Sequence, residues 1–142
     1  MSKWNKCAEN QEFYRCSVCG NIVVKLNDSG MVPWCCGRAM EKIELSNTDD
    51  VIEKHEPDWE MDGCKLKIKI GSVPHPMEDM HYIQWIFVKT DTGFHVRFLS
   101  PNDDPRVCFT LSKKEKPEYV YAYCNIHGLW VSRIDIECED GD

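Results

Sequence analysis

Cysteines and histidines are the residues of this 142-residue chain that are best suited to bind a metal ion, and it has nine of the first and five of the second. Near the C-terminus, Cys124 and His127 are separated by two residues. A tight turn between two strands would point both side chains inward, toward one ion. A lone Cys-x2-His pair is weak support for a site. Three further histidines, His55, His75 and His81, lie in loop-like or strand-entry stretches and can converge on the same ion. With His127 and Cys124 this would give four imidazoles and one thiolate.

Each of these histidines has its own sequence context. His55 lies in a charged loop, His75 stands between two prolines, and His81 begins an apolar stretch. The prolines restrict the backbone on both sides of His75, which suits a ligand whose direction must be preset. Any one histidine alone is more often a surface or hydrogen-bonded residue than a ligand. We leave His95 out, because it is expected to alternate outward between two apolar neighbours.

A second group of potential ligands follows the spacing Cys-x2-Cys-x15-Cys-Cys and consists of Cys16, Cys19, Cys35 and Cys36. The odd number of cysteines prevents a complete set of disulfides within one chain, and a bridge between two adjacent cysteines would be strained. Four thiolates on a knuckle and a facing strand end make a tetrahedral site suited to zinc or to a single iron, and the spacing does not choose between them. Because about 40 residues are too few for a self-sufficient core, metal binding would supply much of the folding free energy of this segment. The adjacency of the last two ligands should distort the tetrahedron.

The elements that must position these residues are all predicted to be strands. A strand from Phe13 leads into a turn closed by Gly20, and a second strand follows over residues 21–26. Residues 43–50 are polar and acidic and are expected to form a linker. Beyond it, apolar residues alternate with polar ones in strands that recur every 10–13 residues, which predicts an antiparallel sandwich of about seven strands: Lys65–Ile70, Tyr82–Val88, Phe94–Phe98, Val107–Leu111, Tyr119–Tyr123 and Trp130–Ile136.

Charge and hydropathy exclude several classes of partner. The formal net charge is −7, with 24 acidic and 17 basic side chains, which argues against nucleic acid or an anionic membrane surface as the main partner. No apolar run approaches the ~18 residues that span a bilayer. The first residues lack a hydrophobic segment of the signal-peptide kind, so we expect a cytoplasmic protein. In such a protein cysteines are more often metal ligands than disulfide partners.

The motifs themselves resemble those of known families. Residues 11–42 resemble desulforedoxin, which has the same cysteine spacing and has glycines beside the ligands, as at Gly20 and Gly37. Three further motifs look like the iron-site motifs of superoxide reductase: Glu53–Pro57, His75–Glu78 with His81–Trp85, and Cys124–Gly128. Together, residues 11–131 resemble the desulfoferrodoxins, the two-iron form of that family.

The resemblance implies an all-β protein with two domains. Residues 1–43 would be a desulforedoxin-like metal-knuckle domain, and residues 44–142 an immunoglobulin-like antiparallel β-sandwich. Each domain would hold one mononuclear non-haem iron, with zinc as an alternative in the four-cysteine site. In the sandwich the four histidines would lie in the equatorial plane with the Cys124 thiolate axial, hydrogen-bonded by the amides of Ile126 and His127, and the sixth position would be open.

The implied activity is the one-electron reduction of superoxide to hydrogen peroxide. Lys54 would guide superoxide, and Glu53 would fill the sixth position of the oxidised iron. The four-cysteine iron would transfer electrons from a small donor protein such as rubredoxin, and the chain would form a homodimer. The remaining thiols are expected to be buried or incidental: Cys7, Cys64, Cys108 and Cys138.

Three other functions compete with this one. In a pure electron carrier both irons would shuttle electrons, but an open coordination position argues against it. A zinc-stapled binding module would be distinguished by metal analysis. A dismutase would release dioxygen as well as peroxide.

Overall fold

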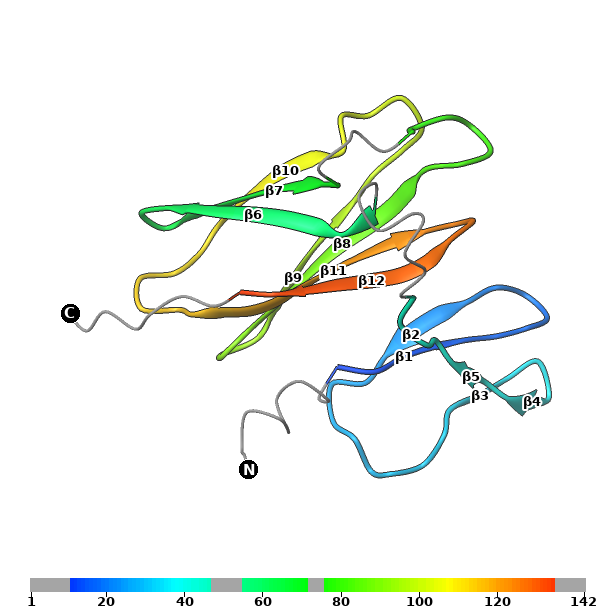
Figure 1. Ribbon diagram of the computed structural model, residues 1–142. Helices are drawn as coiled ribbons and strands as arrows, with labels where there is room; N and C mark the ends of the chain where they lie inside the picture. The colour runs from blue at the N-terminus through cyan, green and yellow to red at the C-terminus, as the bar shows by residue number, and fades with distance from the viewer. Residues whose placement is uncertain (1–10, 47–54, 72–75, 135–142) are drawn as a thin grey trace. The chain divides into compact units, whose positions relative to one another are not determined.

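The computed structural model describes residues 11–46, 55–71 and 76–134, and the regular elements in these ranges are β-strands (Figure 1). The chain divides into two units, Met1–Glu44 and Leu45–Asp142. None of the described residues belongs to a helix long and apolar enough to cross a membrane. The all-β class expected from the sequence is therefore confirmed.

The first unit is built from very short strands. A three-stranded antiparallel sheet has the order β2-β1-β5, and a separate hairpin pairs β3 with β4. The bounds are Phe13–Arg15 for β1, Ile22–Val24 for β2, Trp34–Cys35 for β3, Arg38–Ala39 for β4 and Glu41–Lys42 for β5. Its buried cluster consists of Tyr14, Cys16 and Met40, against which Val23 and Cys35 pack. So small an apolar core leaves the stability of the unit dependent on other interactions.

In its described residues the second unit is a sandwich of seven antiparallel strands, in agreement with the prediction of about seven, although no predicted range covered the strand Pro57–Asp62. One sheet has the order β10-β7-β6 and the other the order β12-β11-β8-β9. The three strands of the first sheet are β6 (Pro57–Asp62), β7 (Lys65–Ile70) and β10 (Arg106–Thr110). The four of the second are β8 (Ile83–Thr90), β9 (Phe94–Phe98), β11 (Pro117–Cys124) and β12 (Gly128–Arg133).

The core of the sandwich follows from alternation along the strands. In β7, Leu66, Ile68 and Ile70 are buried while the lysines between them are exposed, as the period-two pattern predicted. The opposite sheet contributes residues such as Ile86 and Val88 to the same cluster. Aliphatic side chains from the two sheets thus pack into one core, and the β11–β12 turn lies at one end of it.

Strand β9 departs from the expectation. His95 was predicted to face outward, but its ring lies 5.9 Å from the ring of Phe109 and its Nε2 lies 3.0 Å from Oε2 of Glu115. Phe94, on the alternate face, stacks on Phe87 at 4.8 Å and remains 37% exposed. The prediction was wrong because a carboxylate from a distant turn gives the imidazole a partner inside, which the local alternation cannot reveal.

The predicted linker is shorter than residues 43–50. The Ile43 amide donates a hydrogen bond to the Phe13 carbonyl (2.8 Å), which extends the sheet of the first unit. The Ser46 amide donates to the Leu129 carbonyl (2.7 Å), and Leu45 forms a bridge with Leu129. The rest of this segment belongs to residues 47–54, which lie outside the described ranges.

Candidate metal centres

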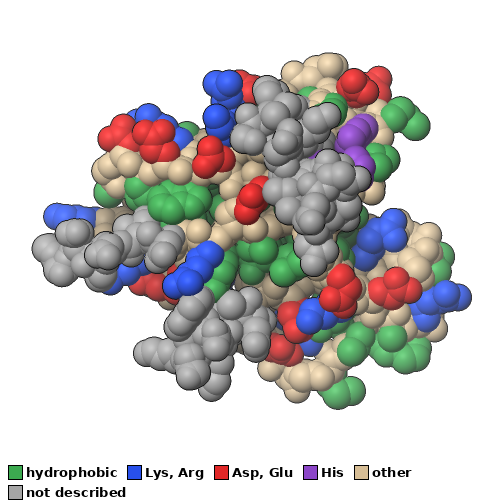
Figure 2. Space-filling model, in the orientation of Figure 1, with side chains coloured by type: hydrophobic (Ala, Val, Ile, Leu, Met, Phe, Trp, Pro, Cys, Tyr) green, Lys and Arg blue, Asp and Glu red, His purple; other side chains and the backbone are tan. Residues whose placement is uncertain are grey.

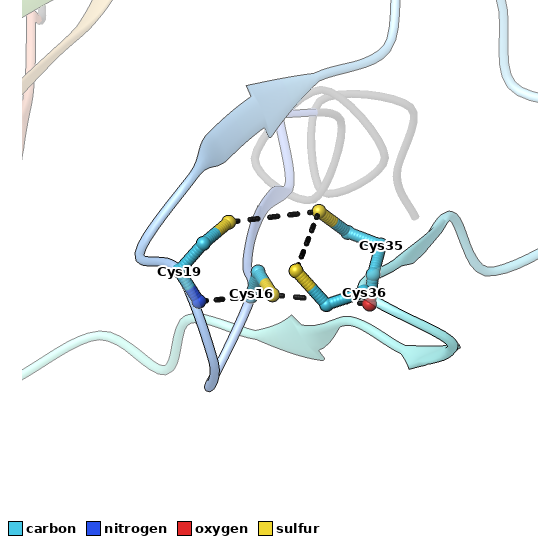
Figure 3. A group of neighbouring side chains, drawn as sticks. All are labelled: Cys16, Cys19, Cys35 and Cys36. Atoms are coloured by element: carbon cyan, nitrogen blue, oxygen red, sulfur yellow. Dashed lines mark hydrogen bonds between the residues drawn. The ribbon is translucent and has the colours of Figure 1, made fainter.

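The four cysteines of the first unit come from two turns that face one another (Figure 3). Their Sγ atoms all lie within 4.8 Å of one another, with 3.7 Å between Cys19 and Cys35 and 4.0 Å between Cys35 and Cys36. These separations are far longer than the ~2.05 Å of a disulfide. A tetrahedral ion with sulfur ligands at ~2.3 Å holds them about 3.8 Å apart. The arrangement therefore fits one ion with four thiolates.

The first turn is organised around the sulfur of Cys16. The amides of Val18 and Cys19 both donate to this sulfur at 3.4 Å, and the Gly20 amide donates to the Cys16 carbonyl. The left-handed backbone that closes this turn was expected at Gly20, and its φ of +83° confirms it. The amide hydrogen bonds, chiefly that of Cys19, lower the pKa of Cys16 to about 6, although burial opposes them. The local backbone thus favours a thiolate before any cation is bound.

The second turn presents two adjacent cysteines to the same point. Cys36 has a φ of +53°, in the left-handed region that non-glycine residues rarely adopt. This backbone conformation directs the Cys36 side chain toward the other three cysteines. Hydrogen bonding with Cys19 and Cys16 raises the pKa of Cys36 to about 12. Four thiolates at this separation therefore require a cation to neutralise them.

A second group of potential ligands lies in the sandwich. One ligand atom from each of His55, His81, Cys124 and His127 lies within 4.8 Å of the others. Nε2 of His55 and Nδ1 of His127 are 3.1 Å apart, and Sγ of Cys124 is 3.9 Å from the same Nδ1. Two nitrogen ligands at ~2.1 Å and at right angles about an ion would be about 3.0 Å apart. The spacing of these donors fits a metal ion between them.

Buried contacts fix His55 in this group. It lies just ahead of β6 and is 1% exposed. Its ring stacks on Trp130 of β12, with centroids 4.9 Å apart and planes at 17°. The Ser132 hydroxyl donates a hydrogen bond of 2.6 Å to the Pro57 carbonyl, which joins the start of β6 to β12. One face of the imidazole is thereby closed to water.

Cys124 and His127 stand at either side of the β11–β12 turn. Cys124 is fully buried and belongs to the core cluster of the sandwich. The His127 amide donates to Sγ of Cys124 at 3.4 Å. Burial raises the pKa of Cys124, whereas hydrogen bonds from the amides of His127 and Ile126 lower it. The expected amide hydrogen bonds to this sulfur are thus confirmed.

Not every predicted site residue falls within the described ranges. The structure brings together three of the four histidines with Cys124, while His75, Glu53 and Lys54 lie outside those ranges, as do Cys7 and Cys138. Cys64 and Cys108, expected to be buried or incidental, are exposed free thiols. Trp130 and Asn125 had no predicted role. Trp130 contacts His55, 75 positions away, and Asn125 bonds to Tyr82, 43 positions away. The Cys-Asn-Ile-His motif was the only available signal for Asn125.

Comparison with known proteins covers nearly the whole chain. Residues 8–43 match the family model for the desulfoferrodoxin N-terminal domain, and residues 47–133 match the desulfoferrodoxin model. A desulfoferrodoxin homolog of Archaeoglobus fulgidus is 44% identical over 124 residues, which cover 87% of this chain and 98% of that protein. The superoxide reductase of Pyrococcus abyssi is 35% identical, over 69% of this chain and 100% of its own length.

A solved structure gives the same result for the fold. The crystal structure of the superoxide reductase from Treponema pallidum aligns with a TM-score of 0.73 and 29% sequence identity. The alignment covers 87% of this chain and 98% of that one. The likeness therefore includes both the cysteine-bearing unit and the sandwich.

Proposed function

The chain belongs to the desulfoferrodoxin family, and on that premise we propose that it is a superoxide reductase. The reaction takes one superoxide, one external electron and two protons to one hydrogen peroxide. The observation that carries this proposal is the convergence of His55, His81, Cys124 and His127 at one end of the sandwich. Three imidazoles and a thiolate are donors that bind iron, and the family match extends over the domain that holds them.

We assign two mononuclear iron sites, one in each proposed domain. In the domain of residues 44–142 the ligands are His55, His75, His81, His127 and Cys124. In the domain of residues 1–43 they are the four cysteines, Cys16, Cys19, Cys35 and Cys36, where zinc is the alternative ion. When bound, iron supplies the one-electron chemistry, and this chain supplies a thiolate held by amides and imidazoles held by packing.

Two charged residues next to His55 are proposed to serve the substrate. Lys54 attracts superoxide toward the site, where a local positive charge must outweigh the repulsion of a chain with a net charge of −7. Salt screens that long-range repulsion within ~10 Å, so the local charge dominates at close approach. By family resemblance, Glu53 is a sixth ligand of the oxidised ion.

The four-cysteine site is proposed to pass electrons from a small donor protein such as rubredoxin. Cys19 and Cys36 are exposed, so a donor can approach the sulfurs without a conformational change. Such encounters bury little surface and need no deep pocket. Because the four thiolates fill the coordination of the ion, this site leaves no position for superoxide itself.

A homodimer is proposed from the exposed apolar residues of the first unit. Trp34 is 71% exposed beside the ligand Cys35, and Leu26 and Met31 are 81% and 73% exposed. Side chains of this size on a unit with so small a core are expected to be covered by a second copy.

A cytoplasmic location is also proposed, since cysteines there more often bind metal ions than form disulfides, and the four-cysteine group lies at metal-ligand separations. Nucleic acid is not proposed as a partner. On the described part of the face shown in Figure 2, acidic and basic side chains are interspersed rather than gathered in one basic patch.

Product stoichiometry tests the proposed activity. The fully reduced protein, with a supply of reductant, receives a known flux of superoxide while peroxide and dioxygen are both followed. We expect about one peroxide per superoxide and no dioxygen produced by the enzyme. Half that peroxide with matching dioxygen would establish a dismutase instead, and no acceleration over the spontaneous reaction would leave an electron carrier or a structural metalloprotein.

The role of Lys54 is tested separately. Lys54→Ala should slow the reaction with superoxide about tenfold and weaken its dependence on ionic strength, because steering by a local charge is screened by salt. Pulse radiolysis at several salt concentrations measures both quantities. An exposed lysine on the outer face of β7 provides the matched control, Lys67→Ala, which should leave the rate unchanged. A Lys54→Ala rate equal to that of the unaltered protein would remove the steering role.

A further inference from the structure

Asn125 joins two ligand-bearing segments that are far apart in the sequence. Its side-chain Oδ1 accepts a hydrogen bond of 2.9 Å from the Tyr82 amide, and its Nδ2 donates one of 3.1 Å to the Met80 carbonyl. Its own amide donates to the Tyr82 carbonyl at 3.3 Å. Asn125 itself lies between Cys124 and His127 in the β11–β12 turn.

The two residues that it holds flank His81 on either side. Residues 78–81 form a tight turn, in which Glu78 and His81 exchange two backbone hydrogen bonds of 2.9 and 3.1 Å. The backbone on both sides of His81 is therefore fixed to the turn that carries Cys124 and His127. The His81 ring lies 5.0 Å from the His127 ring at 65°, so the two imidazoles meet at the place this bonding predicts.

We propose that Asn125 is a positioning residue that sets the placement of His81 relative to Cys124 and His127. This inference rests on the proposed metal site of the sandwich. Asn125 touches no ligand atom in the described contacts, so it acts through the backbone of its neighbours. Its effect on the reaction is to keep one imidazole at bonding distance from the ion that the other ligands bind.

The chemistry of the side chain makes the proposal specific. A side-chain amide has an acceptor oxygen and a donor NH2 on the same planar group. Here the oxygen bonds to Tyr82 and the NH2 to Met80, on opposite sides of His81. A carboxylate keeps the acceptor for the Tyr82 amide, but it would place a second oxygen against the Met80 carbonyl. Asn125→Asp therefore removes the donor and adds a negative charge without a change in shape, whereas Asn125→Ala removes both bonds without adding a charge.

The test uses the full chain loaded with iron, compared with Asn125→Asp and Asn125→Ala. Loss of iron from the sandwich site to a chelator is followed together with the thiolate-to-iron absorption and the electron paramagnetic resonance of that site. We expect iron loss at least tenfold faster in both variants and an altered spectrum. The signals of the four-cysteine site should not change, and they serve as an internal reference.

Asn102→Asp is the matched control, because it makes the same amide-to-carboxylate change at an exposed position of the sandwich. Its φ of +75° is one that aspartate tolerates, and the described contacts give its side chain no hydrogen bond. It should leave iron loss and spectrum unchanged. If both Asn125 variants keep the wild-type spectrum and an iron-loss rate within twofold, the proposal is overturned, even where their thermal stability falls.

A double-mutant cycle with His81 tests the route of the effect. If Asn125 acts through His81, then Asn125→Asp should speed iron loss little further in a His81→Ala background. Fully additive effects would overturn the positioning role. These readouts do not use superoxide, so the inference fails or stands separately from the proposed activity, which the stoichiometry measurement decides.

Discussion

The two metal centres are built in opposite ways. The four cysteines lie within 21 residues and are held by backbone turns around a minimal core, and Cys19 and Cys36 are exposed. The ligands in the sandwich span residues 55–127, and His55 and Cys124 are buried among the aliphatic and aromatic side chains of two sheets. One site is made by local geometry and the other by tertiary packing.

This difference shows what each unit needs from its ion. The first unit has little to hold it together except the four thiolates, so its ion contributes to folding. The sandwich has its own core, and its ligands are held in place by contacts such as the stack of His55 on Trp130. We infer that metal binding stabilises the fold of the first unit, whereas the fold of the sandwich positions the ligands of the second centre.

The largest expected effect comes from removing a ligand of the four-cysteine site, where the two units should respond differently. Cys16→Ser should unfold the first unit, because apparent metal-binding free energies of about 10–16 kcal/mol are typical of small zinc-thiolate domains. The sandwich should keep its structure. Amide chemical shifts recorded for both units in one sample measure this. Cys108→Ser, at an exposed thiol, is the control and should change neither unit. A first unit that remains folded in the variant would contradict the contrast drawn here.

A smaller effect is expected from the support of the second centre. Trp130→Ala should destabilise the sandwich by about 3–5 kcal/mol, because it leaves a cavity beside His55. Trp34→Ala, at a residue 71% exposed beside the other centre, should cost less than about 0.5 kcal/mol when unfolding is measured at a dilution where the proposed dimer has dissociated. Urea unfolding of each variant, followed by signals assigned to each unit, gives the two values. Equal costs would mean that tryptophan burial does not distinguish the centres.

The smallest expected effect concerns the hydrogen bonds to the ligand sulfurs, which differ between the two centres. Asn21 donates a side-chain hydrogen bond of 3.6 Å to Cys35, whereas Cys124 receives its bonds from backbone amides. Asn21→Ala should lower the reduction potential of an iron in the first site by ~20–40 mV, which corresponds to the loss of roughly 0.5–1 kcal/mol. Protein-film voltammetry measures this shift. Asn27→Ala, at an exposed turn position, should leave the potential unchanged, and a shift of equal size there would refute the assignment.

The sequence predicted what depends on local pattern. Alternation along β7 gave both its bounds and its buried face, because lysines and aliphatic residues alternate without interruption. The cysteine spacing gave the first centre for the same reason, since all four ligands belong to two turns. For the second centre, residue types and loop contexts indicated the candidate ligands, and the resemblance made the set specific, because residues so far apart have no fixed spacing.

What the sequence did not predict depends on contacts across the fold. His95 was placed outward because its neighbours are apolar, yet Glu115, twenty residues away, holds it inward. Asn125 stood within a recognised motif, but its role depends on Met80 and Tyr82, whose proximity only the pairing of β11 with β8 creates. Such partners are invisible to any pattern read along the chain.

The left-handed backbone of Cys36 affects how strongly the first site binds its ion. Holding a non-glycine residue at a φ of +53° costs about 1–2 kcal/mol, which the bound ion must offset. A segment that loses its ion relaxes and must recover that conformation before it binds again. Because about 1.4 kcal/mol corresponds to a factor of ten in an equilibrium constant, a glycine at position 36, which adopts this backbone freely, should remove a cost of about tenfold in metal affinity while it also removes one ligand. The strain at Cys36 is therefore the cost of placing two adjacent thiolates on one ion.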